Sequence, residues 1–118
     1  MDAATLAPTV APSLPSIAPF PRSAVEASLR GELIEAVKIE ALIRGISLPA
    51  APTQITTAAV HVDSLVVVSI LCVVDPIVGF ALADNVVRAG GYVSVESALG
   101  HLLPHIEREY NKRKGAKP

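Results

Sequence analysis

The residues of this chain best placed to do chemistry are Asp63, Ser64 and Leu65, which open its longest apolar stretch. A serine at such a position can cap a helix, and its hydroxyl can also carry a covalent group. Backbone N–H groups and the positive end of the helix dipole favour an anion there, so a phosphodiester on Ser64 would be stabilised. Ser64 is therefore the first candidate functional residue, and a plain helix cap is the structural alternative.

Other residues offer weaker chemistry. His101 and His105 have the spacing of two metal ligands on one helical face, but Pro104 lies between them and no third ligand is near in the sequence. We expect surface histidines and no metal site. Cys72 lies inside the apolar stretch, where we expect a small, buried and unreactive side chain. Gly90-Gly91 lacks the lysine and hydroxyl residue of a phosphate-binding loop, so we expect a turn there.

Length and charge limit the classes of function. The 118 residues suit one small domain. The net charge of -1 is neither the strong positive charge typical of nucleic-acid-binding domains nor a strong negative charge. Nucleic acid is therefore not an expected partner. The single cysteine cannot form an internal disulfide, which favours an intracellular protein.

Three regions follow from the composition. Residues 1–22 are rich in Pro and Ala and are expected to form a disordered arm. This arm carries Asp2 and several prolines in place of the basic and apolar parts of a secretory signal, so we expect a cytoplasmic location. Residues 23–111 are expected to form a helical domain, and residues 112–118 a basic tail.

The first helix is predicted from Ser23, as N-cap in a capping box with Glu26, to about Arg44, with Gly45 ending it. Its apolar residues recur at steps of three and four: Val25, Leu29, Leu33, Ile34, Val37, Ala41 and Leu42. A long loop should follow to Val62, which includes His61.

The second helix is predicted from Ser64, although its valines alone would favour a buried strand. The capping residues, the absence of a second strand to pair with and the helical neighbours favour the helix. We expect an inward face of Val67, Ile70, Leu71, Val74, Ile77 and Val78. A kink or restart is expected at Asp75-Pro76, because proline removes a helical hydrogen bond. The chain's mean hydropathy of +0.49 is high enough that a membrane span over residues 64–82 has to be considered. Asp75, Pro76 and Gly79 interrupt this stretch, which disfavours a span.

The last part of the chain should hold a short helix at residues 84–89 and a longer helix capped by Ser94. The packing stripe of that longer helix comprises Val95, Ala98, Leu99, Leu102 and Leu103, and extends past Pro104 to Ile106 and Tyr110.

The order of a serine, a hydrophobic helix, a glycine and an apolar residue resembles the acyl carrier protein family. The resemblance covers residues 23–107, and the positions that carry it, besides Asp63-Ser64-Leu65, are Val68, Ile70, Val74, Val78, Gly79, Leu82, Asp84 and Ser94-Val95. It implies an all-α, four-helix bundle with three main helices, a short helix III and a long first loop.

The resemblance also implies a function. Ser64 would carry covalent 4'-phosphopantetheine, with Asp63 and Leu65 as recognition neighbours. An acyl-sheltering core would be formed by Val68, Ile70, Val74 and Val78. The chain itself would be no enzyme but a monomer that carries an acyl group as a thioester, loaded by a phosphopantetheinyl transferase and visited by acyl ligase, synthase or acyltransferase enzymes.

Two departures from the family pattern affect this expectation. Val66, Val67 and Ser69 occupy positions where acyl carriers usually present acidic residues, so docking should depend more on apolar contact. The segment from Asp84 to Ser94 is about two residues longer than is usual in the family. Together with the N-terminal arm and the basic tail, these departures favour a carrier of specialised lipid or secondary-metabolite biosynthesis. The alternatives are a helical interaction module without a prosthetic group and a single-span membrane protein.

Overall fold

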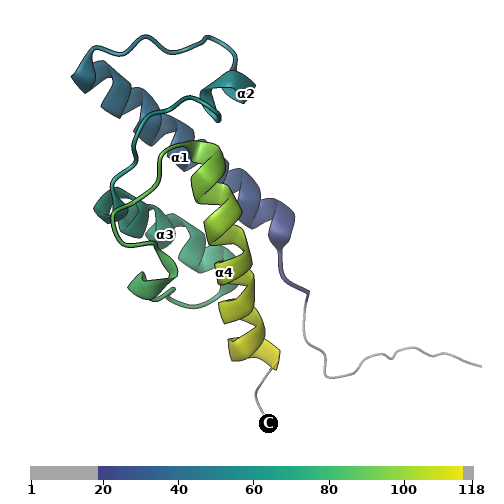
Figure 1. The fold of residues 1–118 in the computed structure, drawn as a ribbon. Helices are drawn as coiled ribbons and strands as arrows, with labels where there is room; N and C mark the ends of the chain where they lie inside the picture. The colour runs from purple at the N-terminus through teal and green to yellow at the C-terminus, as the bar shows by residue number, and fades with distance from the viewer. Residues whose placement is uncertain (1–18, 116–118) are drawn as a thin grey trace, which may run out of the picture.

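A computed structural model describes residues 19–115, with side chains placed through residue 113. Within that range the chain forms four α-helices and one 3-10 turn: α1 (Arg22–Arg44), α2 (Pro52–Ile55), α3 (Ser64–Val78), η2 (Asp84–Val86) and α4 (Val95–Gly115). Both α3 and α4 pack against α1, while the loop that carries α2 spans one end of the bundle (Figure 1). The all-α prediction is confirmed.

The helix α1 forms because apolar side chains at every fourth position are buried together: Val25, Leu29, Leu33, Val37 and Ala41. It ends where Gly45 adopts the left-handed conformation, with φ of 71°. There the Ile46 N–H donates to Ala41 O at 2.8 Å and the Gly45 N–H donates to Leu42 O at 3.3 Å, which satisfies two carbonyls of the last turn. Leu42, predicted to face inward, is 82% exposed because it projects from the side of α1 opposite Leu33.

The start of α1 differs from the predicted capping box. The helix begins at Arg22, Pro21 is its N-cap, and no side chain caps it. The Glu26 carboxylate accepts instead from Arg30 at 2.9 Å. Phe20 packs on Tyr110 with ring centroids 5.5 Å apart, so the chain is held against the bundle before Ser23. The predicted disordered arm, residues 1–22, lies mostly outside the described residues.

The segment 64–78 is a helix and not a strand, as predicted. The Asp63 carboxylate accepts from the Leu65 N–H at 3.1 Å, and Ser64 is the first helical residue. The predicted restart at Pro76 is wrong: α3 continues to Val78 and ends at Gly79. Pro76 removes one helical hydrogen bond, but only the last turn of α3 follows it, so the loss affects little of the helix.

The predicted inward face of α3 is confirmed, with Val67, Ile70, Leu71, Val74 and Val78 buried and Ile77 partly buried. Cys72, predicted to be buried, is exposed instead. Leu71 and Val74 lie on the core side of the helix. Because each helical residue is rotated by about 100° from the one before, Cys72 points away from the core and towards solvent.

The loop between α1 and α3 contains a helical turn that sequence analysis missed. Pro52 occupies the first helical position, which suits its fixed φ and missing N–H, and Ile55 is 3% exposed. Residues 84–89, predicted to be helical, form only the 3-10 turn η2, and Val87 is already extended.

The helix α4 is capped as predicted, since Ser94 Oγ accepts from the Ser97 N–H at 3.0 Å. It continues through Pro104 and reaches Gly115, so the helix includes part of the expected basic tail of residues 112–118. Among the described residues, no helix combines the length and apolarity needed to cross a membrane.

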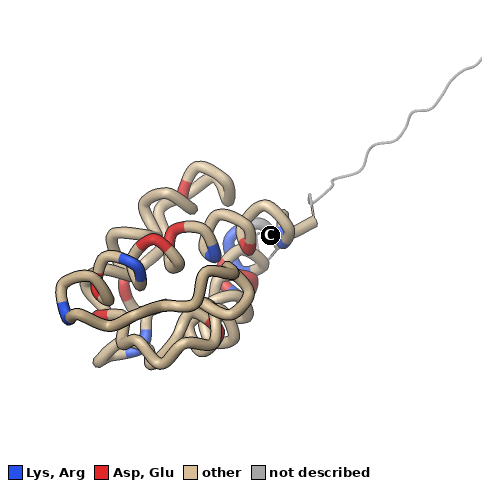
Figure 2. The backbone as a smooth tube through the Cα atoms, turned by 90° about the horizontal axis from the view of Figure 1, so that it is seen from above, with Lys and Arg blue, Asp and Glu red and all other residues tan. Residues whose placement is uncertain are grey.

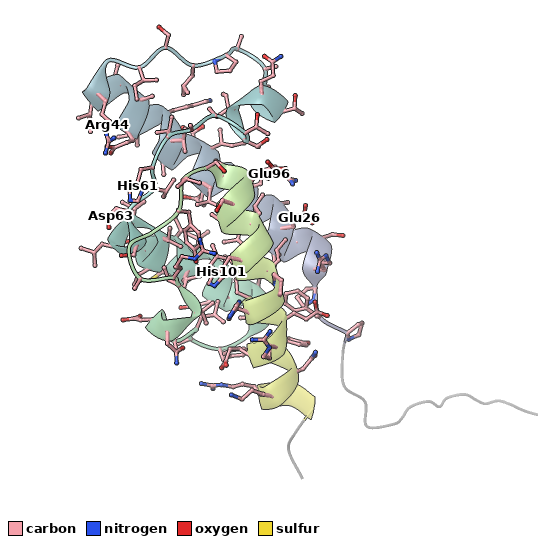
Figure 3. The ribbon with its side chains drawn as sticks, in the orientation of Figure 1. Glu26, Arg44, His61, Asp63, Glu96 and His101 are labelled. Carbon is pink, nitrogen blue, oxygen red and sulfur yellow. The ribbon has the colours of Figure 1, made fainter. Side chains whose placement is uncertain are left out.

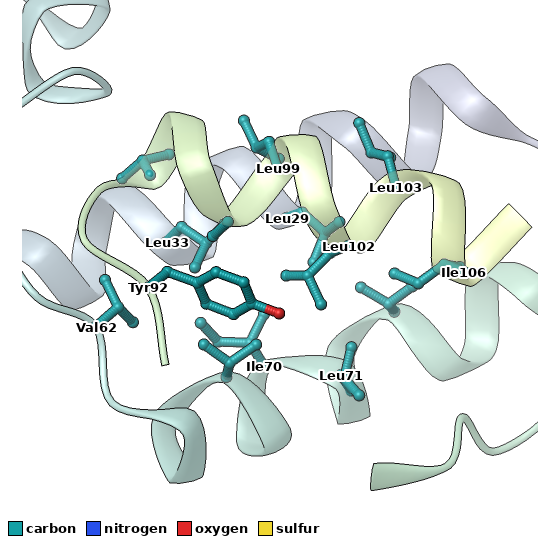
Figure 4. Close-up of a cluster of buried hydrophobic side chains, with 14 of the residues drawn as sticks. Leu29, Leu33, Val62, Ile70, Leu71, Tyr92, Leu99, Leu102, Leu103 and Ile106 are labelled. Carbon is teal, nitrogen blue, oxygen red and sulfur yellow. The ribbon is translucent and has the colours of Figure 1, made fainter. Parts of the chain in front are cut away.

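One core joins the helices and loops. Leu29 and Leu33 of α1 meet Ile70 and Leu71 of α3 and the leucines of α4, with the Tyr92 ring among them (Figure 4). Charged positions of both signs are interspersed around this core and do not gather at one end (Figure 2).

Gly91 provides a direct test of how closely two loops pack. Its φ is 85°, and a Cβ added to it would lie 2.1 Å from Val62 O and 3.0 Å from Ser64 N. We expect Gly91→Ala to lower the free energy of unfolding, measured by urea titration, by more than about 3 kcal/mol.

Gly90→Ala is the matched control for that substitution. Gly90 has a similar φ of 89° but open space around the added Cβ, so we expect a loss of only about 1–2 kcal/mol. Equal losses for the two variants would contradict a close approach at Gly91.

Candidate functional site

Ser64 lies where the loop from α2 enters α3, at a partly exposed position. Its hydroxyl lies 3.5 Å from the Asp63 carboxylate, and the neighbouring Leu65 side chain is 74% exposed. The residues Ser64, Asp63 and Leu65 are therefore together at an accessible helix start, as the sequence predicted. Figure 3 shows Asp63 beside His61 at this end of α3, on the same side of the molecule as Arg44 at the end of α1.

The electrostatics at this helix start have two opposing parts. The first turn of any helix presents backbone N–H donors and the positive end of the macrodipole, which favour an anion. The Asp63 carboxylate already uses the N–H of Leu65. A phosphate group on Ser64 would share the remaining positive potential with Asp63, and it would remain in solvent because both side chains are accessible.

The backbone just before Ser64 is held by two short hydrogen bonds. Val62 N–H donates to Tyr92 O at 2.8 Å, and Tyr92 N–H donates to Val62 O at 2.9 Å. This isolated antiparallel bridge joins the loop before α3 to the loop before α4. Gly91, directly preceding the bridge, permits the approach because it has no Cβ.

The Tyr92 side chain extends this attachment to α4. It is 1% exposed, and its hydroxyl accepts from the Arg88 N–H at 2.8 Å. The same hydroxyl lies 2.7 Å from His101 Nδ1 and donates to it when the imidazole is neutral. The His101 ring also stacks on His105 at 4.2 Å between centroids. Sequence analysis treated both histidines as surface residues and missed this network, because the pairing of Tyr92 with His101 depends on the fold.

The predicted acyl-sheltering residues are not all equivalent. Ile70, Val74 and Val78 are buried, whereas Val68 is only partly buried and lies outside the core cluster. Val68 follows buried Val67 by one residue, so it turns to the flank of α3. The expected core therefore keeps three of its four members.

Two of the surface grooves among the described residues have a helix of the bundle on each side and do not include Ser64 in their lining. One, of about 320 Å³, lies between α1 and α4 and includes Arg22 and Arg30 in its lining. Both guanidinium groups are engaged, Arg22 with Glu107 at 3.4 Å and Arg30 with Glu26 at 2.9 Å. The second groove, of about 210 Å³, lies between α1 and α3 and is lined by five apolar residues together with Ser69, Glu32 and Glu35.

No group of three or more potential metal ligands occurs within residues 19–115. Comparison of the chain with protein-family models, curated proteins and solved structures finds no match. The functional argument therefore depends on the residues themselves.

The surroundings of His101 predict a pH-dependent stability. Burial, followed by the nearby His105 and Arg88 charges, lowers the pKa of His101 below its usual 6.5. Between that lowered pKa and about 6.5 the unfolded chain binds more protons than the folded one. We therefore expect the free energy of unfolding to be highest above pH 6.5 and to fall as the pH decreases below it, measured by urea titration at each pH.

Substitution of His101 by Asn tests the cause. An amide oxygen can still accept from the Tyr92 hydroxyl but does not titrate in this range. His101→Asn should flatten the pH dependence between pH 5 and 7. An unaltered slope in His101→Asn would refute the assignment.

Proposed function

We propose that this chain is a carrier domain in which the Ser64 hydroxyl receives 4'-phosphopantetheine. The observation that carries the proposal is the accessible Ser64 at the first residue of α3, between the N-cap Asp63 and the exposed Leu65. The resemblance of this helix and its flanking residues to acyl carrier proteins supplies the chemistry. An acyl group would be carried as a thioester on the terminal thiol of the arm.

The loading step needs a nucleophile that a separate enzyme can reach. The Ser64 oxygen would attack the phosphorus that joins pantetheine to the nucleotide in coenzyme A. A P–O bond to Ser64 forms, the bond to 3',5'-adenosine bisphosphate breaks, and the hydroxyl proton leaves to a base on the transferase. The exposed Leu65 and the partly exposed Ser64 support access by such an enzyme.

The domain's own contribution is to hold Ser64 in place. Asp63 fixes the helix start, and the Val62–Tyr92 bridge fixes the loop before it. The described residues near Ser64 supply no thioester chemistry in this proposal, so ligase, synthase or acyltransferase partners would perform it.

Partner binding at α3 would rely little on electrostatic steering. Asp75 is the one charged residue between Ser64 and Val78, and its carboxylate accepts from the Leu82 N–H at 2.9 Å. Apolar and shape contacts would therefore contribute most at this helix, which suits a carrier dedicated to a specialised lipid or secondary-metabolite pathway.

Intact-mass measurement after incubation with coenzyme A and a broad-specificity phosphopantetheinyl transferase tests the proposal. We expect the mass to increase by one phosphopantetheine group. Ser64→Ala should abolish the gain without unfolding the chain, because Asp63 remains as the helix cap.

Ser69→Ala provides the matched control. Ser69 is the other exposed serine of α3, and its hydroxyl donates to Leu65 O at 3.3 Å. This variant should be loaded as the unsubstituted chain is. The absence of any mass gain with several transferases would overturn the carrier proposal and favour an interaction module without a prosthetic group.

A further inference from the structure

The outer side of α1 and α3 carries a concentration of exposed aliphatic side chains. We name it the α1–α3 apolar face, and it comprises Ile39, Leu42 and Ile43 of α1, Ile46 just after that helix, and Val66 and Val73 of α3. Their exposed fractions run from 40% for Ile46 to 82% for Leu42. Of the large hydrophobic residues that are exposed in the described range, only Leu65 and Val93 lie outside this face.

These residues form one continuous surface. The groove between α1 and α3 is lined by Ile39 on one helix and by Val66 and Val73 on the other, with the Glu32 and Glu35 side chains along its α1 edge. Ile43 follows Ile39 by one turn of α1, and Leu42 lies beside it on the outward side. The face therefore extends from the groove to the C-terminal end of α1.

We propose that a second copy of this chain covers the α1–α3 apolar face, so that the protein forms a two-fold symmetric dimer. A two-fold contact requires only one patch, which each copy presents to the other. From their exposed fractions, the six residues together expose roughly 600 Å², which is less than the roughly 800 Å² per partner of a stable interface, so the contact must also include the rim of the groove. This proposal replaces the sequence-based expectation of a monomer and does not depend on the carrier function.

The charges around the face fit a copy of itself. The outward side of α3 carries Ser69, Cys72 and Val73 and no charged residue, and homodimer interfaces are more apolar than the contacts of transient partners. On α1 the rim holds both signs, with Lys38 Nζ 3.3 Å from the Glu35 carboxylate. Because Glu32 and Glu35 both line the groove, an antiparallel contact would have to place Lys38 of one copy beside these carboxylates of the other, so that the two grooves do not add negative charge.

The face leaves Ser64 outside the contact. Ser64 does not line the α1–α3 groove, and Val68, one turn further along α3, lies on the flank of the helix away from it. A dimer could therefore present two Ser64 hydroxyls at once.

Sedimentation or light-scattering measurement of the molar mass over a concentration series up to about 200 µM tests the dimer. We expect the mass to rise from 12.3 kDa towards twice that value. Leu42→Glu places a charge on the face at its most exposed residue and should raise the dissociation constant at least about tenfold. Val73→Glu should do the same from α3.

Val93→Glu is the matched control, because Val93 is 66% exposed but lies outside the face. It should dimerise as the unsubstituted chain does, and circular dichroism should show that all three variants are folded. Cys72, the one cysteine of the chain, adds a second readout: a bismaleimide should cross-link two copies through it, and less so in Leu42→Glu.

Two results would overturn the proposal. One is a mass of 12.3 kDa at every concentration, which would leave the face to a different partner. The other is equal weakening by Leu42→Glu and Val93→Glu, which would place the contact elsewhere.

Discussion

Tyr92 makes the contact on which the arrangement around Ser64 depends. Its backbone pairs with Val62, its ring is in the core, and its hydroxyl joins the Arg88 backbone to His101 of α4. One residue therefore holds the start of α3, the loop after η2 and the middle of α4. A second backbone bond, from the Glu96 N–H to Thr56 O at 2.8 Å, also joins the loop before α3 to the first turn of α4, and buried Val67 holds the first turn of α3 in the core. Loss of the Tyr92 contact would therefore loosen the loop before α3 without detaching the helix.

The core and the surface of α3 have different roles in the proposed functions. Its buried face, with Val67 and Val74, fixes the helix against α1. Under the proposals, its first turn would present Ser64 for covalent attachment, and Val66 and Val73 of α3 would supply two of the six residues of the α1–α3 apolar face. The valine-rich sequence of α3 makes this possible because nearly every position is apolar, so burial of one side leaves apolar residues on the other.

Much of the fold could be predicted from local chemistry. Gly45 and Gly79 end their helices in the left-handed conformation, and Ser94 and Asp63 cap theirs through side-chain oxygens. These signals act over three or four residues, so they are visible in the sequence. The capping box at Ser23 was wrong because a distant contact, Phe20 on Tyr110, brings the chain onto the bundle earlier.

For the candidate site, the sequence alone determined the serine, the capping pair Asp63-Ser64 and the apolar helix that follows, because these depend on adjacent residues. The structure decided that Asp63 is the cap, where the sequence analysis had also considered Ser64, and that Ser64 is the first helical residue. Only the tertiary structure decided which apolar residues are exposed: Leu42 and Cys72 were expected inside and lie outside. It also decided the pairing of Tyr92 with Val62 and His101. Such features depend on which side of a helix meets a neighbour and on contacts across 9 to 30 positions of the chain, neither of which a local pattern specifies.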